Sequence, residues 1–170
     1  MEVNKSVERP YPSVTVTEKA ARALKSGHPW VYGEEVNSVT GTPENGGIVD
    51  VYNAKGKWQG AGFYNDHSKI RVRILSTNTN DRFDDAYWRR KLQWAVDYRK
   101  TVMGADFRCC RLIFGEADGF PGLTVDRFED VLAVQILCLG TDLRKSKLLT
   151  TLVDILREMG ETINVVYERS

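Results

Sequence analysis

The chain has 170 residues, of which 42% are hydrophobic and 28% charged, and its formal net charge is +1. This is the composition of an ordinary globular protein, which argues against global disorder, and the near-zero charge excludes nucleic-acid binding through a basic field over the whole molecule. Three cysteines, two of them adjacent, make a poor disulfide framework, and no stretch approaches the about 20 apolar residues that cross a bilayer.

The first 78 residues predict short strands and one small helix. Residues 1–12 have no periodicity and are expected to form a loose lead-in. Thr17 is expected to cap a helix over residues 18–26. Strands are expected at 14–16, 47–52 and 70–75, where residues alternate, and at 57–64, which is aromatic and rich in glycine. Residues 27–32 are expected to form a turn that leads into a strand, and the segment after Tyr32 a loop. This number of short strands is typical of a small β-barrel.

The second half predicts a mixed α and β module after a polar linker at Ser76–Asn80. Helices are expected over residues 81–103 and 142–159, where apolar residues recur at helical spacing, and strands over 111–116, 123–128, 131–139 and 164–167. The predicted domains are therefore 1–78, the barrel, and 79–170, an α+β module. The last strand either pairs back onto the preceding hairpin or belongs to a sheet that continues past Ser170, so we expect this module to be incomplete at its C-terminus.

Candidate binding residues gather in the first half. Lys69, Arg71 and Arg73 alternate along a predicted strand and should project from one face, which suits phosphate groups. The alternative is an ordinary solvated face. Lys19, Arg22 and Lys25 on the short helix could add cations to this face, and His28 could be a polar tip on an RNA-binding edge. The alternative for His28 is a simple turn residue, with Trp30 as a core anchor.

The remaining motifs favour a structural role over a catalytic or metal-binding role. Gly60 and Gly62 in one strand indicate either a bend or a close approach by another backbone or a ligand. Three carboxylates, Glu116, Asp118 and Asp126, lie in or near a dense turn, but their spacing does not match an EF-hand. A small-molecule enzyme that uses these acids is a further alternative, and it would need a metal. No Ser/His/Asp or Cys/His arrangement and no glycine-rich phosphate loop is legible. We therefore assign no catalytic residue and no metal ligand from sequence.

Several stretches resemble a known family. Gly27–Tyr32, Gly60–Asn65 and Ile70–Leu75 resemble the N-terminal PUA domain of bacterial S-adenosylmethionine-dependent ribosomal RNA cytosine-C5 methyltransferases. Arg111–Phe128 is similar to the signature of their middle domain, and Val166–Ser170 to the strand that follows it. The matches occur in the family's order over nearly the whole chain. One departure is Asp66, which stands where many relatives carry a proline.

The resemblance implies a function for a longer protein. A PUA-like β-barrel and an α+β domain would precede a Rossmann-like domain, absent from this chain, that binds S-adenosylmethionine and carries a catalytic cysteine. None of the three cysteines here matches that position, so we expect a fragment without catalytic domain or cofactor. Its expected partner is large-subunit ribosomal RNA, in the cytoplasm and away from membranes, and a homodimer is left open. The alternative is a stand-alone PUA-type RNA-binding or interaction module with no enzymatic activity.

Overall fold

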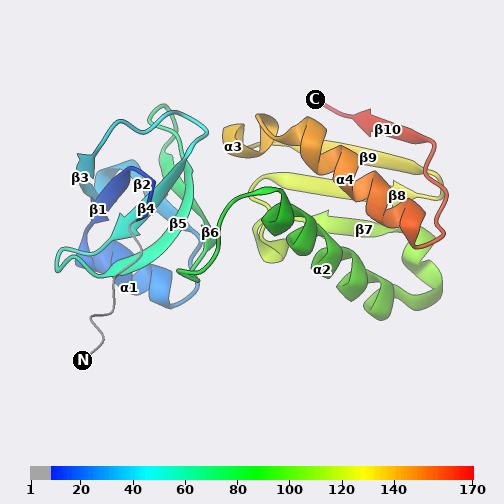
Figure 1. Ribbon diagram of the computed structural model, residues 1–170, viewed down its shortest axis with the longest axis horizontal. Coiled ribbons are helices and arrows are strands. Elements are labelled where there is room, and N and C mark those ends of the chain that lie inside the picture. Colours follow the sequence, from blue (N-terminus) through cyan, green and yellow to red (C-terminus); the bar gives the residue numbers. More distant parts are fainter. Residues whose placement is uncertain (1–8) are drawn as a thin grey trace.

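The computed structural model describes residues 9–170, which form two sheets that lie side by side (Figure 1). Most of the expected lead-in lies outside the described residues. The first sheet has six strands in the order β2-β6-β5-β4-β1-β3, and only β1 and β4 pair in parallel. Its strands are β1 (Ser13–Val16), β2 (Trp30–Tyr32), β3 (Val36–Thr40), β4 (Ile48–Tyr52), β5 (Trp58–Tyr64) and β6 (Ile70–Ser76).

The predicted barrel is an open one. β2 and β3 are the two edges of the six-stranded sheet, and the 3-10 turn η1 (Gly33–Glu35) joins them along the chain. This turn is held by its own contacts, since Glu35 Oε1 accepts a hydrogen bond from the Tyr32 backbone N–H at 3.0 Å. The sheet curves around its core, but the hydrogen-bonded ladder does not close between its edges (Figure 1).

Helix α1 (Glu18–Lys25) confirms the predicted cap and apolar face. The Thr17 hydroxyl accepts a hydrogen bond from the Ala20 N–H at 3.2 Å, which satisfies one of the unpaired donors at the helix start. Ala20, Ala21 and Leu24 are buried in the core of the first sheet. The other buried members of this core are Val14, Val16, Val31, Val49, Val51, Tyr64 and Val72.

Strand β3 was not predicted, because it carries almost none of the usual burial signal. Four of its five residues are exposed, and Val39 keeps 44% of its surface open to solvent. The strand is an edge, held by antiparallel hydrogen bonding to β1 alone. An edge strand that buries no face shows no clear alternation of apolar and polar residues.

The second sheet has four strands in the order β10-β9-β8-β7. β7 (Cys109–Phe114), β8 (Leu123–Phe128) and β9 (Val131–Ile136) are antiparallel, and β10 (Val165–Glu168) pairs with β9 in parallel. Helices α2 (Asp85–Met103) and α4 (Lys145–Glu158) lie on one face of this sheet (Figure 1). Short 3-10 turns, η2 (Gly104–Arg108) and η3 (Gly115–Asp118), flank β7.

Helix boundaries in this half differ from the predicted ones for local reasons. α2 begins at Asp85 and not at residue 81, because the Asp84 carboxylate caps it by accepting from the Tyr87 N–H at 2.9 Å. Asp81 instead accepts a hydrogen bond from the Ser76 hydroxyl at 2.6 Å. The helix expected over 142–159 corresponds to α4, which begins three residues later, and an unexpected short helix, α3 (Leu139–Asp142), precedes it. The expected strand over 131–139 ends at Ile136. Within residues 9–170, no helix has the length and apolarity to span a membrane.

Phe63 couples the two sheets. It belongs to β5, yet its ring, 3% exposed, packs in the core of the second half, stacked on Trp88 with ring centroids 6.1 Å apart. A Cβ on Gly140 would lie 2.2 Å from the Phe63 ring, so only glycine fits there. The Arg144 guanidinium covers the ring at 4.8 Å and donates hydrogen bonds at 2.8 Å to the carbonyls of Gly46 and Gly140. The two sheets are therefore joined by packing as well as by the chain.

We expect Phe63→Ala to lower the free energy of unfolding by about 3–5 kcal/mol, because truncating a buried aromatic ring leaves a cavity. Phe128→Ala is the matched control, since that ring is 58% exposed, and it should change stability by less than about 0.5 kcal/mol. Urea denaturation followed by circular dichroism measures both. Equal losses in the two variants would contradict the placement of Phe63.

Gly62 gives a second test, because β6 approaches it closely. A Cβ there would lie 2.1 Å from the carbonyl oxygen of Arg73, so the glycine pair in β5 marks close approach of a neighbouring backbone. Gly62→Ala should cost about 2–3 kcal/mol of stability in the same denaturation experiment. At Gly60 the added Cβ would meet the Ser76 carbonyl at 3.1 Å, so Gly60→Ala should cost less, and the reverse order would count against this pairing.

Candidate nucleic-acid interface

Strand β6 shows the alternation that its sequence predicts. Val72 is buried in the core of the first sheet and Ile74 packs against that core. Arg71 and Arg73 lie half-buried on the other face, and Lys69, just before the strand, is exposed. The three cations that we proposed as phosphate ligands are therefore neighbours, but their surroundings differ.

Arg73 is not a free cation. Its Nη1 donates to Glu116 Oε1 at 2.8 Å, and the two side chains are 19% and 24% exposed. Trp30 Nε1–H donates to the same oxygen at 3.0 Å, and the Arg73 guanidinium lies 5.3 Å from the Trp30 ring centroid. The charge of Arg73 is thus balanced by a carboxylate from the second half.

Arg71 pairs with no carboxylate of the described residues. One of its terminal nitrogens lies 2.6 Å from the point that a Cβ on Gly33 would occupy, so the glycine leaves room for the guanidinium. Its Nε is buried and has no hydrogen-bond partner among residues 9–170. Lys69 makes no ion pair with any described residue either. The cationic capacity of this face therefore rests on Arg71 and Lys69.

An aromatic row lies beside these cations at the edge of the first sheet. The ring centroids of His28, Trp30 and Tyr32 are 6.0 to 6.4 Å from one another. All three residues are half-buried, whereas Val31 between them is fully buried. Trp30 is therefore not the core anchor that the sequence suggested but part of a surface that faces the second half.

The other two predicted cations lie elsewhere. Lys19 and Lys25 are exposed on α1. Lys25 lines a groove of about 340 Å³ with Lys57 and Trp58, and that groove shares no residue with the surroundings of Arg73. The structure thus places Arg73 beside Trp30, in the aromatic row to which His28 also belongs, and leaves the α1 lysines outside this group.

The three carboxylates of the dense turn do not converge on a metal. Each one meets an arginine instead, at 2.8, 2.7 and 2.8 Å, in the pairs Glu116–Arg73, Asp118–Arg99 and Asp126–Arg111. Across residues 9–170, no group of three or more His, Cys, Asp or Glu side chains is arranged to hold a metal ion. The metal-dependent alternative that these acids suggested therefore has no geometry to support it here.

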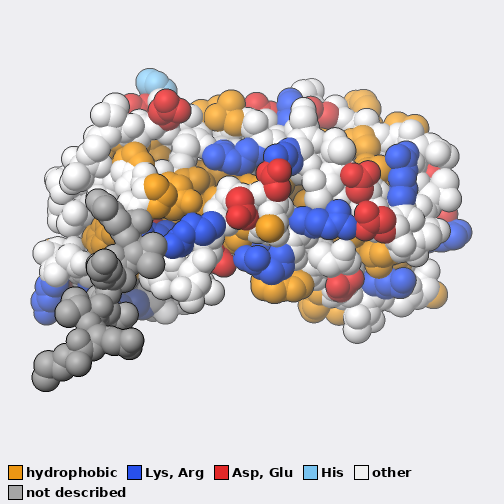
Figure 2. Space-filling model, in the orientation of Figure 1, with side chains coloured by type: hydrophobic (Ala, Val, Ile, Leu, Met, Phe, Trp, Pro, Cys, Tyr) orange, Lys and Arg blue, Asp and Glu red, His pale blue; other side chains and the backbone are white. Residues whose placement is uncertain are grey.

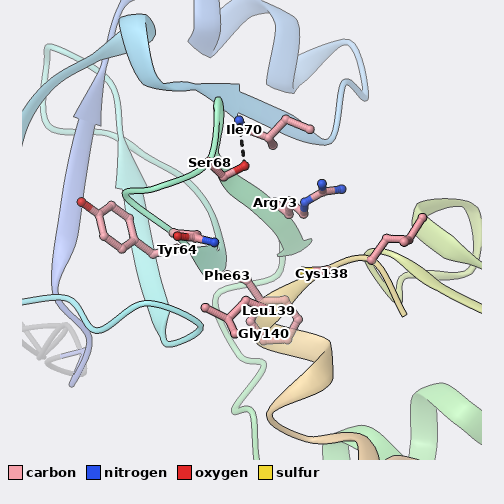
Figure 3. A pocket seen from close by; sticks show the side chains of 10 residues that line it. Phe63, Tyr64, Ser68, Ile70, Arg73, Cys138, Leu139 and Gly140 are labelled. Atoms are coloured by element: carbon pink, nitrogen blue, oxygen red, sulfur yellow. Dashed lines mark hydrogen bonds between the residues drawn. The ribbon is translucent and has the colours of Figure 1, made fainter. Parts of the chain in front are cut away.

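A cleft that no sequence pattern indicated separates the two sheets at this point. It measures about 480 Å³. Trp30 and Arg73 of the first sheet line one side, and the second half contributes Phe114, Glu116 and Leu137. A smaller pocket adjoins it, sharing Arg73 and Leu137. Figure 3 shows this pocket, with Arg73 pointing from β6 toward the second half of the chain.

Charge on the molecule is mixed rather than concentrated. On the face that Figure 2 shows, lysine and arginine side chains lie among carboxylates along the boundary between the two halves. This pattern agrees with a net charge of +1 and with the arginine–carboxylate pairs just described. Any anionic ligand here would be held by local contacts, not by a broad basic surface.

Comparison with known proteins identifies part of this arrangement. Residues 14–77 match the family model of a PUA-like domain. The chain is 34% identical over 150 residues to the "Ribosomal RNA large subunit methyltransferase I" of Serratia proteamaculans, and 32% identical over 160 residues to that of Vibrio cholerae. These matches cover 88% and 94% of this chain but 37% and 39% of the relatives. The chain thus spans less than two fifths of the length of these curated relatives.

Solved structures agree in fold. A protein from Streptococcus mutans described as a SAM-dependent methyltransferase superposes with a TM-score of 0.75 over 92% of this chain and 40% of its own, at 16% identity. A methyltransferase solved in complex with SAH gives a TM-score of 0.74 with the same coverage. Residues 14–77 thus match a PUA-like domain, and both sheets together share the fold of part of these solved structures.

Proposed function

We propose that this chain is the N-terminal, RNA-binding and substrate-positioning part of an S-adenosylmethionine-dependent methyltransferase that modifies a cytosine of large-subunit ribosomal RNA in the cytoplasm. The observation that carries this is the match of residues 14–77 to a PUA-like domain, together with 34% identity to a ribosomal RNA large subunit methyltransferase over 88% of this chain. In this proposal, residues 1–78 bind RNA, and residues 79–170 connect that module to the catalytic part.

The RNA-binding surface that we propose begins with the six side chains predicted from sequence: Lys19, Lys25, His28, Lys69, Arg71 and Arg73. Arg71 and Lys69 are the phosphate ligands best supported, because neither is neutralised by a carboxylate of the described chain. His28 and Arg73 stand beside them, on the aromatic row and at the cleft. Lys19 and Lys25 would contact RNA only along a second path over α1. A homodimer remains a prediction.

The S-adenosylmethionine site of the whole protein, in this proposal, lies outside these residues. Cofactors of this type bind at the carboxyl ends of parallel strands, at a switch point in an open α/β sheet. The second sheet does not fit that arrangement, because β7, β8 and β9 are antiparallel and only β10 pairs in parallel. Glu116 lines the cleft, but its Oε1 already accepts hydrogen bonds from Arg73 and Trp30, so we do not assign this carboxylate to the cofactor.

The double variant Lys69→Ala/Arg71→Ala tests the RNA-binding surface. Binding to a large-subunit ribosomal RNA fragment should weaken, and the slope of log affinity against log salt should fall by about 0.7 for each phosphate of single-stranded RNA that is no longer neutralised. Fluorescence anisotropy at several salt concentrations measures both. Lys100→Ala/Arg157→Ala, on α2 and α4, removes the same charge from exposed positions that pair with no carboxylate of the described residues, and it should leave the slope unchanged. Equal changes in both variants would refute a specific surface.

Calorimetric titration of S-adenosylmethionine into this chain tests where the cofactor binds. We expect no heat of binding, because β9 and β10 are the one parallel pair of the second sheet, whereas open α/β sheets bind such cofactors at a switch point between parallel strands. The RNA fragment from the preceding experiment, titrated into the same protein, is the positive control for folded material. A saturable heat with S-adenosylmethionine at micromolar concentration would place a cofactor site within residues 1–170 and overturn this part of the proposal.

A further inference from the structure

We propose that the cleft between Trp30 and Phe114 holds one unpaired RNA base, with its edge against the Arg73–Glu116 pair. This inference rests on the proposed function, since it assumes that RNA is the ligand, and adds where and how a single nucleotide is held. The cleft lies between the two sheets, so it uses residues of both.

The walls of the cleft are aromatic and apolar side chains that remain open to solvent. Phe114 is 54% exposed and Leu137 is 70% exposed, on the side of the second half. Trp30 lies opposite them in the chain's first sheet and belongs to the aromatic row. Exposed apolar surface gathered at one concave site is typical of binding sites, and aromatic rings are the usual platforms for unpaired bases.

Between these walls lie polar atoms with free hydrogen-bonding capacity. Glu116 Oε1 accepts from both Trp30 and Arg73, whereas Oε2 has no hydrogen-bond partner among residues 9–170. Arg73 donates only through Nη1, so its Nη2 and Nε are not used by any described protein group. The cleft thus presents a fixed acceptor next to fixed donors.

This combination favours a nucleobase over an apolar peptide. The edge of a base carries hydrogen-bond donors and acceptors side by side, and its faces stack on aromatic side chains. An apolar side chain would fill the cleft but leave the polar atoms of Glu116 and Arg73 without partners, which is costly once water is excluded. The volume, about 480 Å³, is within the usual range for small-ligand sites.

The proposed phosphate ligands lie on the same strand as the cleft. Arg71 is two residues from Arg73, which is about 7 Å along a β-strand. Both side chains leave β6 on the face opposite the core. A nucleotide whose base enters the cleft would therefore have cations close to its backbone. Since Arg73 is neutralised by Glu116, the cleft itself adds stacking and hydrogen bonds but little net charge.

The test uses the 170-residue chain and a short polyuridine RNA with one central 2-aminopurine, a fluorescent base that dims when it stacks. Saturating wild-type protein should quench the 2-aminopurine. Phe114→Ala should abolish this quenching and weaken binding, measured by anisotropy, about tenfold. Phe128→Ala is the matched control, because Phe128 has a similar exposure of 58% but lies at the other end of the β7–β8 pair, and it should behave as wild type.

The outcomes separate this inference from the proposed function. Two results together show that the cleft holds the base. Lys69→Ala/Arg71→Ala should weaken RNA binding while the 2-aminopurine that does bind stays quenched. The 2-aminopurine bound to Phe114→Ala should stay bright. If wild-type protein binds the RNA but the 2-aminopurine stays bright, or Phe114→Ala and Phe128→Ala behave alike, the cleft does not hold a base and the RNA-binding proposal stands. If wild-type protein binds neither this RNA nor the ribosomal fragment, both proposals fail.

Discussion

The placement of one aromatic ring, that of Phe63, determines how the rest of this molecule is arranged. The residue is part of β5, but its side chain is buried in the core of the other half, against Trp88. Gly140 leaves the space that the ring needs, and Arg144 covers it while binding the Gly46 carbonyl. Packing of this kind resists sliding, because close-packed interiors do not deform continuously. The cleft between the two sheets therefore has a defined geometry.

The ion pair with Glu116 reduces the net positive charge that Arg73 and its neighbours offer to a phosphate. From sequence, Arg73 is one of three alternating positive charges, yet its partner in space is a carboxylate 43 residues away along the chain. Of these three charges, Lys69 and Arg71 then remain to contribute to salt-dependent affinity. The same pairing holds Arg73 and Trp30 in a fixed relation to each other. A surface with little net charge can still bind an RNA chain when stacking and directed hydrogen bonds replace a broad electrostatic field.

Local features could be predicted from sequence, and features formed between distant residues could not. The Thr17 cap, the alternation in β6 and the helical spacing in α2 depend on residues within a few positions of one another, so they are legible in the chain. Strand β3 lacks that signal because it is an exposed edge. The hydrogen bond from Trp30 to Glu116 joins residues 86 positions apart, and no periodicity reports such a contact.

The same distinction explains why a domain match identifies only half of the candidate site. The PUA-like match ends at residue 77, so it includes Trp30, Arg71 and Arg73 but not Phe114 or Glu116. If the chain ended at residue 77, the first sheet would still present Arg73 and the aromatic row, but the opposite side of the cleft would be missing. Phe63 would also lose the core in which its ring is buried. Binding studies of residues 14–77 alone would therefore measure the proposed phosphate contacts and miss the cleft, whose lining comes from both halves.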